Sequence, residues 1–324
     1  MKIIGITKKN TPCMWTCIGK GIEGLGKYVD IPVIMYDQED IKQLQPDNDE
    51  IILIFQAGNF RCEGWNLRKV KKCFPNSKII PLGADTNIFL FIHNRHELDY
   101  KLVDLYLDLD IRCIEHYGNL GIKVDQWMWT TSDWFLNYVK NFSLNNKYEK
   151  EYDFIGVYHP GTLNHGYRKE MLEFIKNKRY KFTNGGGNGH EDNDLDRLLS
   201  YYAKSYISLG TTSHGIDNFR TLKGFRDWIG MYLDCPLIYD NWEMVKNCYN
   251  DNVIYYDYNN FQTIIDSFKL LQNNDLRKEY LNKQKEWIVN NTIDKQLLKL
   301  LIKHNFISRN QLCTSQIENT DFLD

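Results

Sequence analysis

The chain has 324 residues, of which 43% are hydrophobic and 14% aromatic, and its formal net charge at pH 7 is −2. This apolar content can fill more than one hydrophobic core, so global disorder is excluded and two domains are expected. The near-neutral charge argues against a general polyanion-binding surface, although it does not exclude a local basic groove.

The first half of the chain alternates short apolar runs with helical patterns. Continuous β-branched or aromatic runs are typical of strands covered on both faces, and they predict strands at 2–6, 31–36, 51–55, 78–82 and 105–109. Helices are expected at 21–28, 37–44, 65–74 and 134–141. Ser132 is the expected N-cap of the last of these helices. This alternation predicts a parallel sheet with right-handed crossovers.

A polar segment at 143–151 separates this half from a second α/β alternation. There the strands are expected at 152–158, 180–184, 203–209, 236–239 and 253–256. Helices are expected at 167–176, 193–201, 261–271, 275–290 and 292–304. The fold class is therefore α/β, with two Rossmann-like, doubly wound domains facing a central cleft. The predicted domains are 1–145 and 152–290, followed by a helix at 291–306 that packs across their junction and a tail at 307–324.

Cysteine usage and hydropathy indicate the compartment. The eight cysteines lack the paired C-x-x-C spacing of a zinc site, so we expect reduced, mostly buried thiols. No signal peptide precedes the first strand, and no apolar run reaches the roughly 18–20 residues of a membrane span. We therefore expect a cytoplasmic protein without a membrane span, in the host cytoplasm if it is viral. The oligomeric state is not indicated.

The most informative motif follows the expected strand at 203–209. Small residues and a histidine come directly after it: Gly210, Thr211, Thr212, Ser213 and His214. A loop of this kind at the carboxyl end of a parallel strand is where doubly wound proteins hold nucleotides. The segment is therefore a candidate donor-binding loop.

A row of cations follows this loop. Arg220, Lys223 and Arg226 recur at three-residue intervals, so one face of a helical segment is positive. Such cations repel one another unless an anion, such as a nucleotide diphosphate, lies between them. Asp227 is a candidate for binding a ribose diol. The alternative is a solvated surface helix with an internal Lys223–Asp227 pair.

A second phosphate-binding candidate follows the first strand of the second domain. Gly161 lies in a glycine-containing loop that leads into a helix carrying Arg168. Glycine lets the backbone approach a phosphate, and the arginine supplies positive charge. The alternative is an ordinary strand-to-helix loop. The glycine-rich run at 183–190 matches neither a P-loop nor a dinucleotide fingerprint, and a plain surface loop explains it equally well.

In the first domain, three residues follow the opening strand: Lys8, Thr11 and Trp15. If the protein transfers a group from a nucleotide donor, they are candidates for contact with the acceptor molecule. Asp85 follows the fourth strand and is the candidate general base that deprotonates an acceptor hydroxyl. The alternative is that Asp85 caps a turn, and Asp125 and Asp133 are rival candidates.

Two further patterns in this domain favour structural roles. Asp104, Asp108 and Asp110 lie in and beside a predicted strand without a histidine or glutamate cluster, so strand-edge solubility explains them better than a metal site. The tryptophans at 127, 129 and 134 are interpreted as core residues rather than as a platform for sugar stacking.

The segment from Asp153 to about Asn290 resembles the CgeB-like (spore maturation protein-like) glycosyltransferases, a GT-B group with bacterial and phage members. The similarity lies in DFIGVYHPG with Arg168 in the next helix, YAKSYISLG up to Gly210, Arg226 ahead of CPLIYD, and NVIYYD. The resemblance implies that the second domain holds the sugar nucleotide and that the first presents the acceptor. Two positions depart from the family pattern. Ile229 stands where relatives have a ribose-binding glutamate, and Asp234 stands where a glycine is usual.

The function that these features predict is transfer of a sugar from a nucleoside diphosphate sugar, with a UDP-sugar as the expected donor, to an acceptor hydroxyl. The predicted cations replace a metal in neutralising the leaving diphosphate, so no metal or other cofactor is expected. Scarce proline beside abundant Asn, Lys, Ile and Tyr indicates an AT-rich genome, such as that of a phage, a large virus or a low-GC bacterium. The acceptor is therefore open between a hydroxymethylated base in phage DNA, a glycan and a protein.

One rival function remains open. Two α/β domains on either side of a cleft are also the architecture of non-catalytic clamps for small anionic ligands. A Rossmann oxidoreductase is disfavoured by the missing dinucleotide fingerprint.

Overall fold

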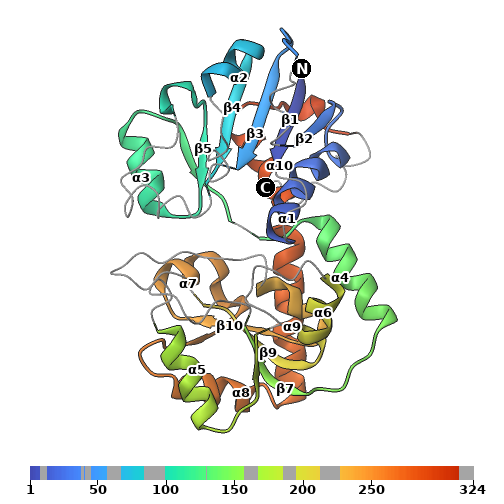
Figure 1. Cartoon of the computed structure of the whole chain (residues 1–324), viewed down its shortest axis with the longest axis vertical. Coiled ribbons are helices and arrows are strands. Elements are labelled where there is room, and N and C mark those ends of the chain that lie inside the picture. Colours follow the sequence, from blue (N-terminus) through green and yellow to red (C-terminus); the bar gives the residue numbers. More distant parts are fainter. Residues whose placement is uncertain are drawn as a thin grey trace. The chain divides into compact units, whose positions relative to one another are not determined.

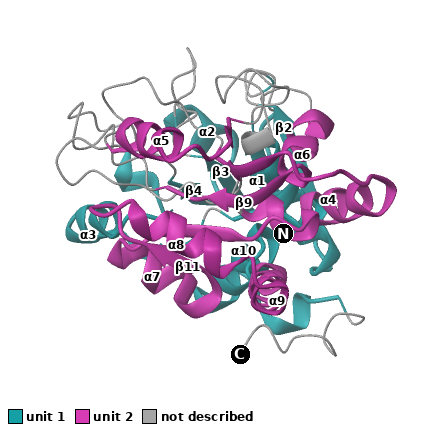
Figure 2. Cartoon of the chain, turned by 90° about the horizontal axis from the view of Figure 1, so that it is seen from below, with its two compact units in different colours: residues 1–134, 291–324 teal, residues 135–290 magenta. Residues whose placement is uncertain are grey.

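The computed structural model of the chain describes residues 1–7, 13–37, 40, 45–56, 67–83, 99–128, 130–156, 167–184, 195–211 and 227–313, without the side chains of residues 13–15 and 227. It divides into two compact units (Figures 1 and 2). Unit 1 comprises Met1–Trp134 and Asn291–Asp324, and unit 2 comprises Phe135–Asn290.

The described part of unit 1 contains a six-stranded parallel sheet with the order β2-β1-β3-β4-β5-β6. Its strands are β1 (Lys2–Thr7), β2 (Val33–Asp37), β3 (Ile51–Gln56), β4 (Ser77–Leu82), β5 (Tyr106–Asp108) and β6 (Val124–Gln126). Its helices are α1 (Cys13–Gly24), η1 (Leu25–Lys27), α2 (Leu67–Cys73), η5 (Tyr100–Leu102), α3 (Ile111–Asn119), the start of α4 (Asp133–Asn145), α10 (Ile293–Lys303) and η9 (Arg309–Gln311).

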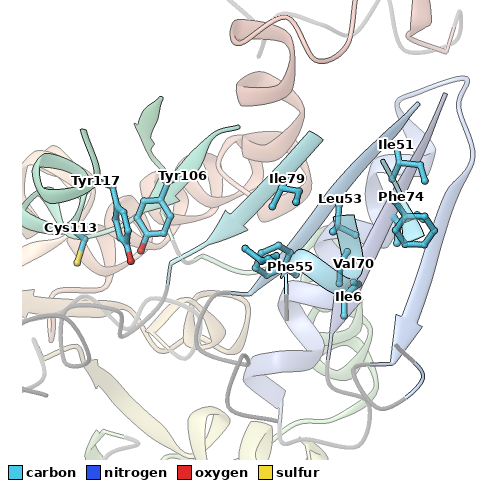
Figure 3. Packing of buried hydrophobic residues seen from close by; sticks show 12 residues of the cluster. Ile6, Ile51, Leu53, Phe55, Val70, Phe74, Ile79, Tyr106, Cys113 and Tyr117 are labelled. Carbon is cyan, nitrogen blue, oxygen red and sulfur yellow. The ribbon is translucent and has the colours of Figure 1, made fainter. Parts of the chain in front are cut away.

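A hydrophobic cluster fixes one face of this sheet (Figure 3). Every residue of β3 is buried, as expected for a central strand covered on both faces. Leu53 and Phe55 of that strand belong to the cluster together with Val70 of α2. Tyr106 and Tyr117 extend the cluster towards β5 and α3, where their ring centroids lie 4.1 Å apart.

The described part of unit 2 contains a five-stranded parallel sheet with the order β11-β10-β9-β7-β8. Its strands are β7 (Tyr152–Ile155), β8 (Phe182–Thr183), β9 (Ser205–Leu209), β10 (Leu237–Asp240) and β11 (Ile254–Tyr256). Its helices are the rest of α4, α5 (Arg168–Asn177), α6 (Leu195–Ala203), η7 (Asp227–Leu233), α7 (Glu243–Tyr249), η8 (Asn250–Asn252), α8 (Gln262–Leu270) and α9 (Asn274–Asn290).

Both sheets share one topology. In each unit the first strand lies between the second and the third, so the direction of winding reverses beside it. This reversal falls between β1 and β3 in unit 1 and between β7 and β9 in unit 2. Ligands of doubly wound proteins bind outside the carboxyl ends of the strands at such a point. The topology therefore defines one candidate position on each unit.

The chain passes between the units at two points. It leaves unit 1 within α4 and returns between α9 and α10. The polar segment at 143–151, where the sequence suggests a boundary, follows this first passage and leads into β7. Helix α10 packs against α1 so closely that a Cβ atom at Gly21 would lie 2.4 Å from the side chain of Ile293.

Three local expectations need correction. The helix expected at 21–28 begins at Cys13 and ends at Gly24. Strand β6 was not expected, because its sequence Val-Asp-Gln carries little apolar signal. Asp227–Leu233, where the sequence predicted an α-helical segment, is a 3-10 helix, and its Trp228 is buried.

The cysteines that the structure describes with their side chains are thiols rather than disulfides: Cys17, Cys73, Cys113, Cys235, Cys248 and Cys313. Among the described residues, no helix combines the length and the apolar character needed to cross a membrane.

Candidate functional site

The candidate site on unit 2 lies where β9 ends beside β7. Gly210 and Thr211 follow β9 directly, and both are buried. The N–H of Gly210 donates to the carbonyl of Ile238 at 2.8 Å, and its own carbonyl accepts from the Tyr256 hydroxyl at 2.9 Å. Residues from β10 and β11 therefore fix the backbone just after β9.

Gly210 is the residue that this close packing requires. A Cβ atom at this position would lie 2.2 Å from Cδ2 of Tyr239, far inside contact distance. The aromatic ring at the carboxyl end of β10 therefore occupies the space that any larger residue would need. The sequence predicted this glycine as part of a donor-binding loop, and the structure adds a packing reason for it.

Arg168 connects α5 to the end of β9. It is the first residue of α5 and only 3% exposed. Its Nη2 donates to the carbonyl of Thr211 at 3.2 Å, and the Tyr239 hydroxyl approaches the same carbonyl at 3.4 Å. The structure thus brings together three of the predicted donor-binding residues, Arg168, Gly210 and Thr211.

A buried carboxylate bonds to Tyr167, the residue just before this arginine. Asp240 ends β10, is fully buried and accepts hydrogen bonds from the Tyr167 hydroxyl and from the N–H of Trp242. Burial, followed by the charge of Asp240, raises the pKa of Tyr167 well above its ordinary value. The phenol is therefore a neutral hydrogen-bond donor at physiological pH. Sequence reasoning missed both residues, although Asp240 ends an apolar strand, as nucleotide-site carboxylates often do.

Thr211 also presents an unused polar atom at this edge. Its side chain is 4% exposed, and its Oγ1 has no hydrogen-bond partner among the described residues. The same holds for Oδ1 of Asn241, which follows β10. Buried polar atoms in this condition are costly, and each calls for an explanation such as a bound ligand.

The carboxyl edge of unit 1 holds a different group. Asp108 ends β5, is 2% exposed and accepts hydrogen bonds from the Tyr106 hydroxyl and from the N–H groups of Leu109 and Asp110. Burial raises its pKa to about 6. A Cβ atom at Gly83 would collide with this carboxylate, so Gly83 packs directly over it.

This finding corrects the expectation that these aspartates only maintain solubility. Asp108 and Asp110 are both buried, and Asp110 caps α3 by accepting from the N–H of Arg112. The sequence did carry the signal, because an acidic residue at the carboxyl end of a predicted strand is unusual in an apolar core. Asp104 forms an ion pair with the exposed Lys78.

Gln56 is a described residue at the winding reversal of unit 1. It ends β3, is 2% exposed, and its amide nitrogen has no hydrogen-bond partner in the part of the chain that the structure describes. Gln56 therefore offers a buried donor where the topology predicts a ligand.

Most predicted site residues lie outside the described residues. These are Lys8, Thr11, Asp85, Gly161, Thr212, Ser213, His214, Arg220, Lys223 and Arg226. Trp15 lies in α1 and Asp227 begins η7, but their side chains are not described.

The two rival carboxylates already have partners. Asp125 is bonded to Lys303 at 2.6 Å and to His304 at 2.7 Å. Burial acts to raise its pKa, but these two hydrogen bonds outweigh it and lower the pKa. Asp133 accepts from the Tyr28 hydroxyl at 2.7 Å. Among the described residues, no group of three or more His, Cys, Asp or Glu side chains could hold a metal ion.

Comparison with known proteins identifies the fold. No protein-family model matches the chain, and no curated protein sequence matches it either. Solved structures do match, and they are GT-B glycosyltransferases. One is a trehalose-6-phosphate synthase studied for glycosyl transfer with retention, at 9% identity and a TM-score of 0.55, covering 95% of this chain and 100% of that one.

Two more structures agree with this result. A sucrose-phosphate synthase from Thermosynechococcus elongatus matches at 9% identity with a TM-score of 0.55, covering 95% of this chain and 100% of that one. A UDP-forming α,α-trehalose-phosphate synthase from Burkholderia vietnamiensis matches at 8% identity with a TM-score of 0.53, covering 84% of this chain and 74% of that one. The two Rossmann-like units are those of the GT-B fold.

Proposed function

We propose that this protein is a glycosyltransferase that binds a nucleoside diphosphate sugar at the carboxyl edge of the unit 2 sheet. The observation that carries the proposal is the buried Arg168 guanidinium at the β7–β9 winding reversal, bonded to the carbonyl of Thr211. An arginine there stabilises negative charge that develops on a leaving diphosphate. The GT-B fold supports this assignment.

The donor and its remaining contacts are part of the proposal. A UDP-sugar is the first donor to test, because one structurally similar synthase is described as UDP-forming. Gly161, Thr212, Ser213 and His214 are proposed to complete the donor loop. Arg220, Lys223 and Arg226 are proposed to neutralise the diphosphate in place of a metal, with Asp227 on the ribose.

The acceptor is proposed to meet unit 1. Lys8, Thr11 and Trp15 are the proposed acceptor contacts, and Asp85 is the proposed general base. Asp108 is a second carboxylate at the same edge of that sheet. The similar structures are synthases of trehalose phosphate and sucrose phosphate, which is a reason to test sugar acceptors before proteins or a modified base in DNA.

Titration calorimetry with UDP tests the donor site. We expect the wild type to bind UDP and Arg168→Gln to bind it at least tenfold more weakly. This loss is on the order of the free energy of one charge-assisted hydrogen bond. Arg277→Gln is the matched control, because Arg277 is a 6% exposed arginine of the same unit that bonds to Asp234 instead. Equal loss in both variants would show that the effect comes from disturbed folding.

Measuring donor turnover distinguishes a glycosyltransferase from a non-catalytic binding protein. A transferase slowly releases UDP from a UDP-sugar even without acceptor, whereas a binding protein leaves the donor intact. We expect UDP release by the wild type to exceed that by Arg168→Gln. A folded wild type that binds none of the nucleoside diphosphates contradicts the proposal.

A further inference from the structure

Unit 1 contains a pocket of 880 Å³ at the amino edge of its sheet, away from the strand ends discussed above. Lys78 is the second residue of β4, Asp104 precedes β5 and Lys123 immediately precedes β6. The segment that follows α10 closes the pocket with His304, Asn305 and Phe306. The proposed donor and acceptor residues do not line it.

Two helix ends build the apolar part of this pocket. Just after α3, Gly121 has φ 82°, and the N–H of Ile122 donates back to the carbonyl of Tyr117 at 3.3 Å. The segment after α10 has the same arrangement. Asn305 has φ 60°, and the N–H of Phe306 donates back to the carbonyl of Leu301 at 2.8 Å. In such motifs the residue after the left-handed position packs against the helix. Ile122 and Phe306 occupy that position, and both line the pocket.

These caps also reduce the negative partial charge that the two helix C-termini place in the pocket. Helix C-termini carry negative partial charge from carbonyls that have no partner within the helix. Here the N–H groups of Gly121 and Asn305 take up further carbonyls of the last turns, at 2.9 and 3.0 Å. The backbone therefore opposes an anion in the pocket less than two uncapped helix ends would.

The side chains give the pocket an excess of positive charge. Lys78, Lys101 and Lys123 all line it, whereas Asp104 is the acidic residue among its lining. Asp104 is already engaged, because its carboxylate accepts from Lys78 at 3.2 Å and from the N–H of Ile79 at 2.9 Å. Neither Lys101 nor Lys123 has an acidic partner within the described part of the chain. Two lysine charges are therefore left without a counter-ion among the described residues.

The lining next to these lysines is apolar. Val103, Ile122 and the ring of Tyr100 contribute to the pocket and also pack against the core cluster of unit 1. Their positions are therefore fixed by the fold. A flat or apolar ligand body gains burial on such a surface, and a doubly charged head group matches two unpaired lysines. A phosphate monoester, with close to two negative charges at pH 7, has both properties.

We infer that this pocket is a second ligand site, which binds a small organic phosphate. Lys101 and Lys123 hold the phosphate, while the apolar or aromatic body of the ligand lies on Val103, Ile122 and Phe306. The site is separate from the proposed donor site, so it stands or falls independently of the glycosyltransferase assignment.

Calorimetry of the full chain with phenyl phosphate tests this inference. The wild type should bind it more tightly than inorganic phosphate, which lacks the apolar body, and more tightly than phenol, which lacks the charge. The double variant Lys101→Gln/Lys123→Gln should bind phenyl phosphate on the order of tenfold or more weakly. The control Lys69→Gln/Lys72→Gln removes two exposed lysines from α2 of the same unit and should stay within about twofold.

Two further measurements make the result decisive. Arg168→Gln should retain phenyl phosphate binding, and Lys101→Gln/Lys123→Gln should retain UDP binding and the wild-type circular dichroism spectrum. The inference is overturned if the wild type does not bind phenyl phosphate, or if the double variant binds it as well as the wild type. It is equally overturned if inorganic phosphate binds as tightly, or if Arg168→Gln abolishes binding.

Discussion

The backbone N–H of Asp133 donates to the carboxylate of Asp294 at 3.2 Å, which joins the two segments of unit 1 that lie next to its chain passages. Asp133 begins α4, just before the chain leaves the unit, and Asp294 lies in the first turn of α10, just after the chain returns. The Tyr28 hydroxyl donates to the Asp133 carboxylate at 2.7 Å. Two carboxyl groups and a phenol thus share one site.

This carboxyl pair should make the stability of the protein depend on pH. Burial, and then the charge of Asp133, raise the pKa of Asp294 to about 7. Because this pKa is higher than that of an unfolded aspartate, the folded state binds the extra proton. The free energy of unfolding should therefore fall as pH rises from about 4 to about 7, and this slope should end above the folded-state pKa.

The variant Asp294→Asn tests this dependence. Asparagine keeps an acceptor for the N–H of Asp133 but carries no charge. We expect the variant to unfold with a flatter pH dependence and to be more stable than the wild type at pH 8 by about 1 kcal/mol or more. Urea unfolding at pH 5 and pH 8 measures this. Glu115→Gln, on the exposed face of α3, is the control, and an Asp294→Asn slope equal to the wild-type slope would refute the assignment.

The sequence predicted the strands better than the polar sites. Runs such as Ile51–Gln56 are apolar throughout, because both faces of a central parallel strand are covered, and this signal is local. Strand β6, with two half-buried residues and one exposed, carries no such signal. The partnership of Asp133 with Asp294 could not be predicted, because 160 residues separate the two in the sequence and only the tertiary fold brings them together.

The candidate site shows the same division. Gly210 and Arg168 were predicted as donor-binding residues from the local sequence alone. A glycine or an arginine near the carboxyl end of a parallel strand favours phosphate binding. The bond between Arg168 and Thr211, and the contact of Tyr167 with Asp240, depend on strand order and could not be predicted from the chain alone. Asp108 was misassigned because its burial depends on the close packing of Gly83, which is far away in the sequence. Its hydrogen bond with Tyr106 of the same strand is local, but the sequence does not show that this strand end is buried.

Asp234 has a backbone conformation that favours glycine. Its φ is 55°, the left-handed region that glycine adopts without cost. Its carboxylate bonds to Nε of Arg277 at 3.0 Å, and Arg277 is only 6% exposed. Asp234→Ala should therefore destabilise the protein by about 2 kcal/mol, from the left-handed backbone and the lost ion pair together.

Asp234→Asn is the matched variant for this position. Asparagine tolerates the left-handed region and keeps an oxygen for Arg277, so its cost should be less than half of that of alanine. Urea midpoints of the two variants decide the matter. An alanine variant as stable as the asparagine variant would mean that neither the backbone nor the ion pair matters here.

Gly210→Ala should disturb both folding and ligand binding. The new Cβ atom would meet the ring of Tyr239 at 2.2 Å, and overpacking of this kind costs about 1–3 kcal/mol or more. Gly118→Ala is the control, because its Cβ would lie 3.5 Å from Val124 in ordinary contact, and alanine favours the helix. We expect the melting temperature to fall in the first variant and to stay level or rise in the second. A Gly210→Ala protein with wild-type stability and UDP affinity would contradict the packing argument.

Variants of Thr211 show whether its hydroxyl binds the ligand or stabilises the fold. Its Oγ1 is buried without a hydrogen-bond partner among the described residues, so removing it should not destabilise the fold. We expect Thr211→Val to unfold at the same urea concentration as the wild type, or a higher one. If the hydroxyl binds the donor, UDP affinity should fall about 2- to 10-fold, the range of one hydrogen bond. Thr211→Ser keeps the hydroxyl and should keep the affinity. If valine and serine bind UDP equally well, Oγ1 does not contact the donor.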